Sequence, residues 1–251
     1  MSGLAAIAVL GFFLGMRHAT DPDHVIAVST IVTRVRGARS AALIGAVWGV
    51  GHTLTIMIVG GGIILLGWVI PARVGLSLEL AVGVMLIVLG GLNLTGLHAH
   101  PHQHGDYVHS HVHQHDPEVH PHLPDQTPMG WLDRHLRGLG LYQLLRPLLV
   151  GVVHGLAGSA AVALLVLTTI RNPAWAIGYL LIFGLGTITG MMLITVLIAL
   201  PMVYSARRVA TFSRGLRVAS GLVSLGFGLF LAYRVGVVAG LFTSRAEWTP
   251  R

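Results

Sequence analysis

The chain has 251 residues, 54% of them hydrophobic and only 10% charged, and its mean hydropathy is +0.76. Soluble domains carry about 25% charged residues, so this chain could not cover its surface in water, and we predict an all-α, polytopic membrane protein. The formal charge of +7 comes from arginines in short loops, where charge sets membrane orientation, and no nucleic-acid motif accompanies it. The absence of cysteine excludes disulfides and thiolate metal ligands.

Six apolar segments follow one another along the chain, and each reaches or exceeds the roughly 20 residues that cross a bilayer as a helix. They run over 4–34, 41–69, 76–97, 147–170, 174–201 and 216–241. One long polar stretch, from His98 to about Arg146, interrupts them. We therefore predict a bundle of about six spans, with three-span units over 1–97 and 146–251 joined by a histidine-rich loop over 98–145.

The arginines gather in alternate loops. One side of the predicted bundle carries Arg34, Arg36, Arg39, Arg134, Arg137, Arg146, Arg207, Arg208, Arg214 and Arg217. The loops on the other side carry only Arg73 and Arg171. By the positive-inside rule the arginine-rich side is cytoplasmic, so both termini are predicted outside and the long polar loop inside. The expected location is a bacterial-type plasma (inner) membrane, crossed several times.

The two halves of the chain resemble each other. Gly15-Met16-Arg17-His18 matches Gly151-Val152-Val153-His154 at an offset of 136, and Trp48-Gly49-Val50-Gly51 matches Phe183-Gly184-Leu185-Gly186 at an offset of 135. Gly83 and Gly90 match Gly221 and Gly228 at an offset of 138. Because each half has an odd number of predicted spans, the second half must enter the membrane inverted. Inverted repeats are typical of transporters, whose substrate site lies near the midplane where the halves meet.

The first apolar segment contains a predicted break. As one straight helix its 31 residues would span about 46 Å, whereas the hydrocarbon core is about 30 Å thick. Pro22 disfavours a helix interior but suits the first turn of a new helix, with Asp21 before it as a cap. We predict one helix ending near His18 and another starting at Asp21-Pro22. The break should leave backbone carbonyls near residues 15–18 without helical partners.

Ionisable side chains cluster around this break. His18, Asp21, Asp23 and His24 lie within seven residues, and ionisable groups inside a membrane are costly and usually functional. Two imidazoles and two carboxylates suit a borderline divalent ion such as Ni²⁺, Co²⁺ or Zn²⁺. His52 in the second span and His154, the counterpart of His18, are further candidate ligands. The alternatives are a polar cluster that only caps a kinked helix, and ordinary helix–helix contacts for His52 and His154.

Ten of the twenty-five residues from 98 to 122 are histidine, which predicts loose metal binding by a disordered loop. Neutral imidazoles are the competent ligands, so binding should weaken as the pH falls through about 6.5. The alternative is an inert hydrophilic linker. The candidate loop ligands are His98, His100, His102, His104, His109, His111, His113, His115, His120 and His122.

The segment Arg17-His18-Ala19-Thr20-Asp21-Pro22-Asp23-His24 resembles the signature of the nickel/cobalt transporter family, in which a His is followed after four residues by Asp-His. Pro22 stands where that family usually has Ala, and Val25 where it usually has Ile. Gly51-His52-Thr53 is similar to a Gly-His-Ser/Thr element in a neighbouring helix of the family. The resemblance implies permease activity for Ni²⁺ or Co²⁺, with His18, Asp23 and His24 central.

The second half departs from the pattern of classical members. They carry an acidic Phe-Asp-Thr-type motif, whereas this chain has His154-Gly155-Leu156-Ala157-Gly158-Ser159. The short layout with this segment is more similar to the urease-accessory branch of the same superfamily. The departure leaves the direction of transport and the preferred metal open.

Three functional hypotheses remain. The first is a secondary permease that imports Ni²⁺ or Co²⁺ as its transported substrate, without a bound cofactor, for metalloenzyme maturation. The second is efflux of the same metals, with the histidine loop as a collector, and the third is a non-transporting membrane chaperone for urease or hydrogenase assembly. The sequence lacks Walker and HExxH motifs, so no enzyme activity is expected. Expected partners are the bilayer, a divalent metal ion, and either a cytoplasmic metallochaperone or a second copy of the chain.

Overall fold

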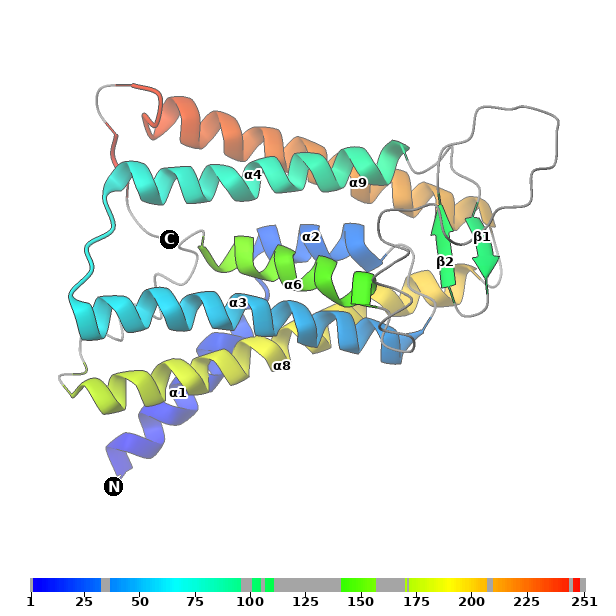
Figure 1. Cartoon of the computed structure of the whole chain (residues 1–251). Helices are drawn as coiled ribbons and strands as arrows, with labels where there is room; N and C mark the ends of the chain where they lie inside the picture. Colours follow the sequence, from blue (N-terminus) through cyan, green and yellow to red (C-terminus); the bar gives the residue numbers. More distant parts are fainter. Residues whose placement is uncertain are drawn as a thin grey trace.

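A computed structural model describes residues 2–32, 37–95, 101–104, 107–110, 141–156, 170, 172–206, 210–243 and 246–248. These residues form a helical bundle with one short pair of strands (Figure 1). The elements in chain order are α1 (Ser2–His18), α2 (Pro22–Val32), α3 (Ala38–Leu66), α4 (Ala72–Thr95), β1 (Pro101–His104), β2 (Tyr107–Ser110), α6 (Leu141–Leu156), α8 (Pro173–Ala206), α9 (Ala210–Tyr233) and the π-helical turn η1 (Arg234–Val238).

Four of the described helices are long and apolar enough to cross a membrane. They cover Ala38–Leu66, Ala72–Thr95, Pro173–Pro201 and Arg214–Val238, close to four of the six predicted apolar segments. Large apolar side chains such as Leu197 and Val238 lie exposed on their outer surfaces, as expected of helices that face lipid. Helices α1, α2 and α6 are shorter, and residues 157–169 lie outside the described part of the chain. The chain is therefore a multi-pass membrane protein, and the exact number of six spans stays a prediction.

The first predicted span is broken where the sequence indicated. Helix α1 ends at His18 and α2 begins at Pro22. In the turn between them the carbonyl of Arg17 accepts hydrogen bonds from the backbone N–H and the hydroxyl of Thr20. The carbonyls of Gly15 and His18 accept from the N–H groups of Ala19 and Asp21. Three of the four carbonyls that we expected to be unpartnered, those of Gly15, Arg17 and His18, therefore accept hydrogen bonds, so the expectation was wrong for these three.

Glycines allow the helix backbones to touch. A Cβ placed on Gly15 would meet the carbonyl oxygen of Phe183, so α1 packs directly on α8, and a Cβ on Gly151 would meet that of Trp48, so α6 packs on α3. Both pairs run parallel, whereas α3 and α8 run antiparallel. In lipid no hydrophobic force drives helices together, so they associate by close packing. Faces of small residues are the usual means of such close approach. Gly11 and Gly15, like Gly151 and Gly155, are spaced four residues apart, and each of these glycines lies at a helix contact.

Helices α4 and α9 cross antiparallel through a second glycine face. A Cβ on Gly90 would lie 2.7 Å from the carbonyl oxygen of Gly221, and one on Gly228 would lie 2.7 Å from that of Gly83. Hydrogen bonds add to this contact, since Ser224 Oγ donates to the carbonyl of Leu86 at 2.8 Å. Figure 1 shows α4 beside α9, with α2 and α6 between this pair and α3; α2 contacts both α4 and α9, and α6 contacts both α3 and α4.

Contacts between the halves are reciprocal. Gly15 contacts Phe183, and their counterparts at the matched positions, Gly151 and Trp48, contact each other as well. In the same way Gly83 meets Gly228 while Gly90 meets Gly221. Exchanging each residue for its counterpart therefore turns one contact into the other.

The histidine-rich segment contains an antiparallel pair of short strands, β1 and β2, with His102 opposite His109. We expected no regular structure there. Only His102, His104 and His109 of the ten candidate loop ligands lie in described residues; His98, His100, His111, His113, His115, His120 and His122 lie outside them. The domain boundaries at 97/98 and 145/146 stay a prediction.

Candidate metal centre

The centre begins where α1 ends. His18 is the last residue of α1, and the turn that follows folds Asp21 back against it. His18 Nδ1 lies 2.9 Å from Asp21 Oδ2, and its other nitrogen, Nε2, lies 2.8 Å from Nε2 of His52. The His18 side chain therefore has a contact at each nitrogen, one on its own turn and one on α3.

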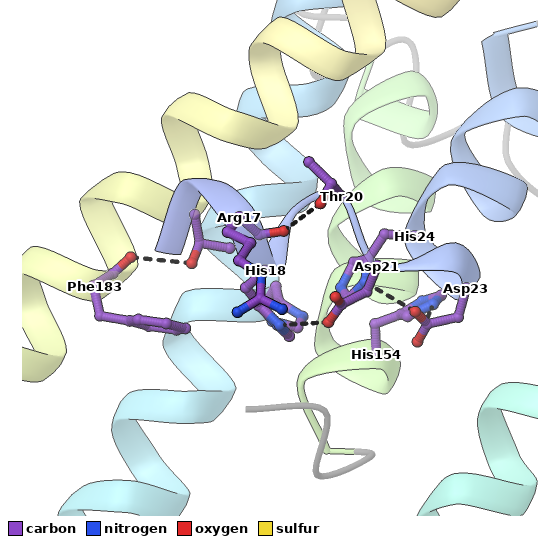
Figure 2. A network of polar contacts seen from close by, with 10 residues as sticks. Arg17, His18, Thr20, Asp21, Asp23, His24, His154 and Phe183 are labelled. Atoms are coloured by element: carbon purple, nitrogen blue, oxygen red, sulfur yellow. Dashed lines mark hydrogen bonds and ion pairs between the residues drawn. The ribbon is translucent and has the colours of Figure 1, made fainter. Parts of the chain in front are cut away.

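The first turn of α2 supplies the next two groups. His24 Nδ1 lies 3.2 Å from Asp23 Oδ1, and Asp23 Oδ2 lies 3.6 Å from Nε2 of His154. A single carboxylate thus reaches one imidazole on α2 and another on α6. Figure 2 shows Asp21, Asp23, His24 and His154 grouped beside His18.

His52 and His154 enter from helices α3 and α6, and both are completely buried. The ring centre of His24 lies 4.8 Å from that of His154, 5.0 Å from His52 and 4.9 Å from His18. The approach of α6 to α3 depends on Gly155, because a Cβ there would lie 2.7 Å from the carbonyl oxygen of His52. Four imidazoles from four helices, α1, α2, α3 and α6, consequently lie together beside the helix break, and the ring of His24 contacts the other three.

Two aromatic side chains close the cluster. The ring of Trp48 stacks on His24 at 6.1 Å and lies 5.4 Å from His154. The ring of Phe183 lies 5.7 Å from His18. Trp48 and Phe183 are counterparts in the two halves, as are His154 and His18, so each half contributes one aromatic ring against the histidine of the other.

Several imidazole nitrogens in the cluster lack a hydrogen-bond partner among the described residues. They are His24 Nε2, His52 Nδ1 and both nitrogens of His154. A buried polar atom without a partner costs about 1–3 kcal/mol, so a group of them calls for an explanation. A bound cation would use the one lone pair that each neutral imidazole offers, because neutral imidazole is a good ligand for borderline divalent metals.

Ligand spacing in the cluster fits a metal ion. One ligand atom each from His18, His24 and His52 lie within 4.8 Å of one another, and the same holds for Asp21, Asp23 and His24. The structure thus brings together all six predicted residues, His18, Asp21, Asp23, His24, His52 and His154. Metal binding by them stays a prediction.

Trp48, Phe183 and Thr187 had no predicted role. The match of Trp48 with Phe183 between the two halves was visible in the sequence, but it does not by itself indicate that these rings contact the histidines. Thr187 stands at the position equivalent to His52, and its hydroxyl donates to the carbonyl of Phe183 at 3.0 Å. The cluster is therefore asymmetric, with the extra imidazole and both carboxylates coming from the first half.

Comparison with known proteins adds a family. The chain is 37% identical over 246 residues to the urease accessory protein UreH of Bacillus sp. (strain TB-90), a match that covers 95% of this chain and 96% of that one. This chain belongs to the UreH family of urease accessory proteins. The predicted resemblance to the urease-accessory branch is confirmed, and in this UreH-family protein it extends over nearly the whole length and not only the motif of the first span.

No protein-family profile matches the chain, and no solved structure matches it.

Proposed function

We propose that this UreH-family protein is a membrane permease that carries Ni²⁺ or Co²⁺ into the cell for metalloenzyme maturation. The observation that carries the proposal is the buried cluster of four imidazoles and Asp23 at the helix break. Ionisable groups at this depth in a membrane protein mark ion pathways. The name of the relative, a urease accessory protein, fits delivery of metal to an enzyme and favours import over removal.

The ligand chemistry favours a borderline divalent ion. Imidazole suits nickel, cobalt, zinc and copper, whereas carboxylate and water ligands suit magnesium, calcium and manganese. Thiolates, which select softer ions, are absent from the chain. A centre of four histidines with neighbouring carboxylates is therefore matched to Ni²⁺ or Co²⁺ better than to the more abundant Mg²⁺.

The reciprocal contacts between the halves support an inverted repeat of three spans each. In a two-fold interface, a contact from residue i to j implies the same contact from j to i, and the pairs Gly83–Gly228 and Gly90–Gly221 follow this rule. Transporters built this way hold the substrate where the repeats meet, often at a broken helix. In this chain the residues that flank the break, His18 and Asp23, contact His52 on α3 and His154 on α6, which belong to different halves.

Import needs a source of free energy, and the membrane potential suffices. A double positive charge moving inward gains about 4.6 kcal/mol per 100 mV of inside-negative potential. We therefore propose passive, potential-driven entry, with the cytoplasmic histidine loop holding the ion after passage. Efflux and a non-transporting chaperone remain the alternatives.

The experiment that tests this function measures accumulation of radioactive Ni²⁺ by cells that express the chain, with and without an uncoupler. Import predicts uptake that saturates with Ni²⁺ concentration and falls when the potential is abolished. Efflux predicts less accumulation than in empty cells, and a chaperone predicts no change. The double variant His18→Ala/His24→Ala should show no uptake. The control is His135→Ala, which should transport normally because His135 belongs neither to the six clustered residues nor to the ten candidate loop ligands.

A further inference from the structure

The buried cluster divides into two sets of three ligands. His18, His24 and His52 form one set, and Asp21, Asp23 and His24 form the other; within each set the ligand atoms lie within 4.8 Å of one another. His24 belongs to both. The two sets differ in chemistry, because one offers only imidazole nitrogens and the other offers mainly carboxylate oxygens.

The two sets also differ in the exposure of their side chains. The side chains of Asp21 and Asp23 are 38% and 18% exposed, whereas those of His18 and His24 are 6% and 0% exposed. His52 is fully buried, and Phe183 covers the ring of His18. An ion that reaches the cluster therefore meets the carboxylates first and the imidazole set second.

His24 can serve both sets because its two nitrogens have different surroundings. Its Nδ1 lies beside Asp23 Oδ1 at 3.2 Å, whereas its buried Nε2 has no hydrogen-bond partner among the described residues. Its ring centre is 4.9 Å from that of His18 and 5.0 Å from that of His52. An ion can therefore keep His24 as a ligand while its other ligands change.

Two members of the imidazole set, His18 and His52, contact each other directly. An ionised Asp21 carboxylate can only accept, so the hydrogen of His18 lies on Nδ1, and the 2.8 Å contact is then a hydrogen bond donated by His52 Nε2 to His18 Nε2. That bond occupies the remaining lone pair of His18. An ion must displace it before His18 can coordinate.

We infer that the transported ion occupies two consecutive positions that share His24, an outer one at Asp21 and Asp23 and an inner one at His18 and His52. The inference rests on the proposed function. The outer carboxylates attract any hydrated divalent cation, and the inner imidazoles accept only borderline metals. Selection against Mg²⁺ is therefore made at the inner position, after capture.

The test uses the purified full chain with the ten candidate loop histidines replaced by asparagine, so that Ni²⁺ binds only at the cluster. Ligands of the resting ion are counted by X-ray absorption at one equivalent of Ni²⁺, and the loading rate is measured by rapid mixing. This parent should show three imidazole ligands. Excess Mg²⁺ should slow loading without displacing Ni²⁺ that is already bound.

Two variants separate the positions. Asp23→Asn should leave the imidazole count unchanged and slow loading about tenfold or more, because a charge that attracts the ion is lost. His52→Ala should shift the resting ion to an oxygen-rich set with one imidazole, with initial loading within about twofold of the parent. If the alanine variant does not insert, His52→Gln gives the same readout. Thr187→Val, at the equivalent position of the second half, is the control and should change neither property.

One outcome would overturn the inference. If Asp23→Asn alters the ligand set of the resting ion and leaves the loading rate unchanged, the six residues form a single composite site. Ni²⁺ would still be bound in that case, so the proposed function would stand. Failure of the parent to bind Ni²⁺ at all would instead refute the proposed function, and the inference with it.

Discussion

At the scale of single residues, some nitrogen atoms of the candidate ligands contact another side chain, and others have no hydrogen-bond partner among the described residues. His18 is oriented by Asp21 at one nitrogen and by His52 at the other, and Asp23 reaches both His24 and His154. Partners of this kind hold a ligating ring in one orientation and tune its affinity for the metal. His24 Nε2 and His52 Nδ1 have no hydrogen-bond partner among the described residues, and a cation would satisfy them.

The first prediction is made at this scale. His18→Ala and His24→Ala should each abolish Ni²⁺ uptake, because the loss of one ligand leaves an incompletely coordinated ion in a site of low dielectric constant. Asp23→Asn should reduce uptake about tenfold or more, because a charge that attracts the ion is lost. Asp23→Asn preserves shape and removes only charge, so it separates electrostatics from packing. Uptake per molecule inserted in the membrane is the measurement. Wild-type uptake by both histidine variants would mean that the ion binds elsewhere.

At the scale of elements, the centre depends on helices that approach closely enough for side chains from four of them, α1, α2, α3 and α6, to meet. Small residues provide this approach at α1 with α8, α3 with α6 and α4 with α9. The turn at Ala19–Asp21 then places the start of α2 beside the end of α1, so that His18 and His24 are neighbours although an unbroken helix would separate them. Packing faces and helix break are thus both required for the cluster.

Adjacent glycines on α4 offer a matched test of the packing faces. Gly90→Ala should destabilise the bundle by about 1–3 kcal/mol, because the new Cβ would lie 2.7 Å from the carbonyl oxygen of Gly221. Gly91→Ala should be neutral or stabilise by up to about 1 kcal/mol, since a Cβ there has no neighbour within 4 Å and alanine favours helix. Thermal denaturation of the two purified variants gives the comparison. Equal melting temperatures would argue against the α4–α9 contact.

At the scale of the whole molecule, α3 and α8 run antiparallel, as the proposed inverted repeat predicts. Ser40 lies exposed at the start of α3, and Ala174 lies exposed at the start of α8. Since these helices are antiparallel, their first residues lie at opposite ends of the bundle.

Cysteine labelling tests this arrangement directly in a chain that has no cysteine of its own. Ser40→Cys should react with a membrane-impermeant reagent only from the cytoplasmic side, and Ala174→Cys only from the other side. Whole cells and inside-out vesicles provide the two conditions, and a variant without cysteine provides the background. Reaction of both positions from the same side would refute the inverted repeat.

The histidine-rich segment leads to a prediction for the molecule as a whole. Deleting residues 98–122 should lower the metal held per molecule but leave saturable transport, because the segment lies between the predicted spans in the sequence and contains none of the six clustered residues. The intact chain should release the same amount of metal when the pH falls through about 6.5, because protonated imidazole cannot coordinate a metal ion. Equilibrium binding at several pH values and uptake assays give the two readouts. Loss of all transport at normal membrane levels would place an essential site in the loop.

Much of the candidate centre could be predicted from residues that are neighbours in the sequence. Pro22 with Asp21 before it determines where a helix can end and restart, because proline restricts its own backbone and that of the residue before it. The apolar runs determine which segments enter the membrane, because a buried backbone in lipid must satisfy its hydrogen bonds as helix. The charged and imidazole groups beside Pro22 were therefore predictable as a group at membrane depth.

Only the tertiary structure decided which of these groups meet. His52 and His154 lie far from the break in sequence, and they reach His18 and Asp23 because glycine faces bring α3 and α6 against each other. The hydrogen bond between His18 and His52, the closure by Trp48 and Phe183, and the division into two ligand sets around His24 arise from that packing. Local sequence determines backbone preferences over a few residues, whereas the contact of side chains from separate helices depends on how whole helix surfaces fit together.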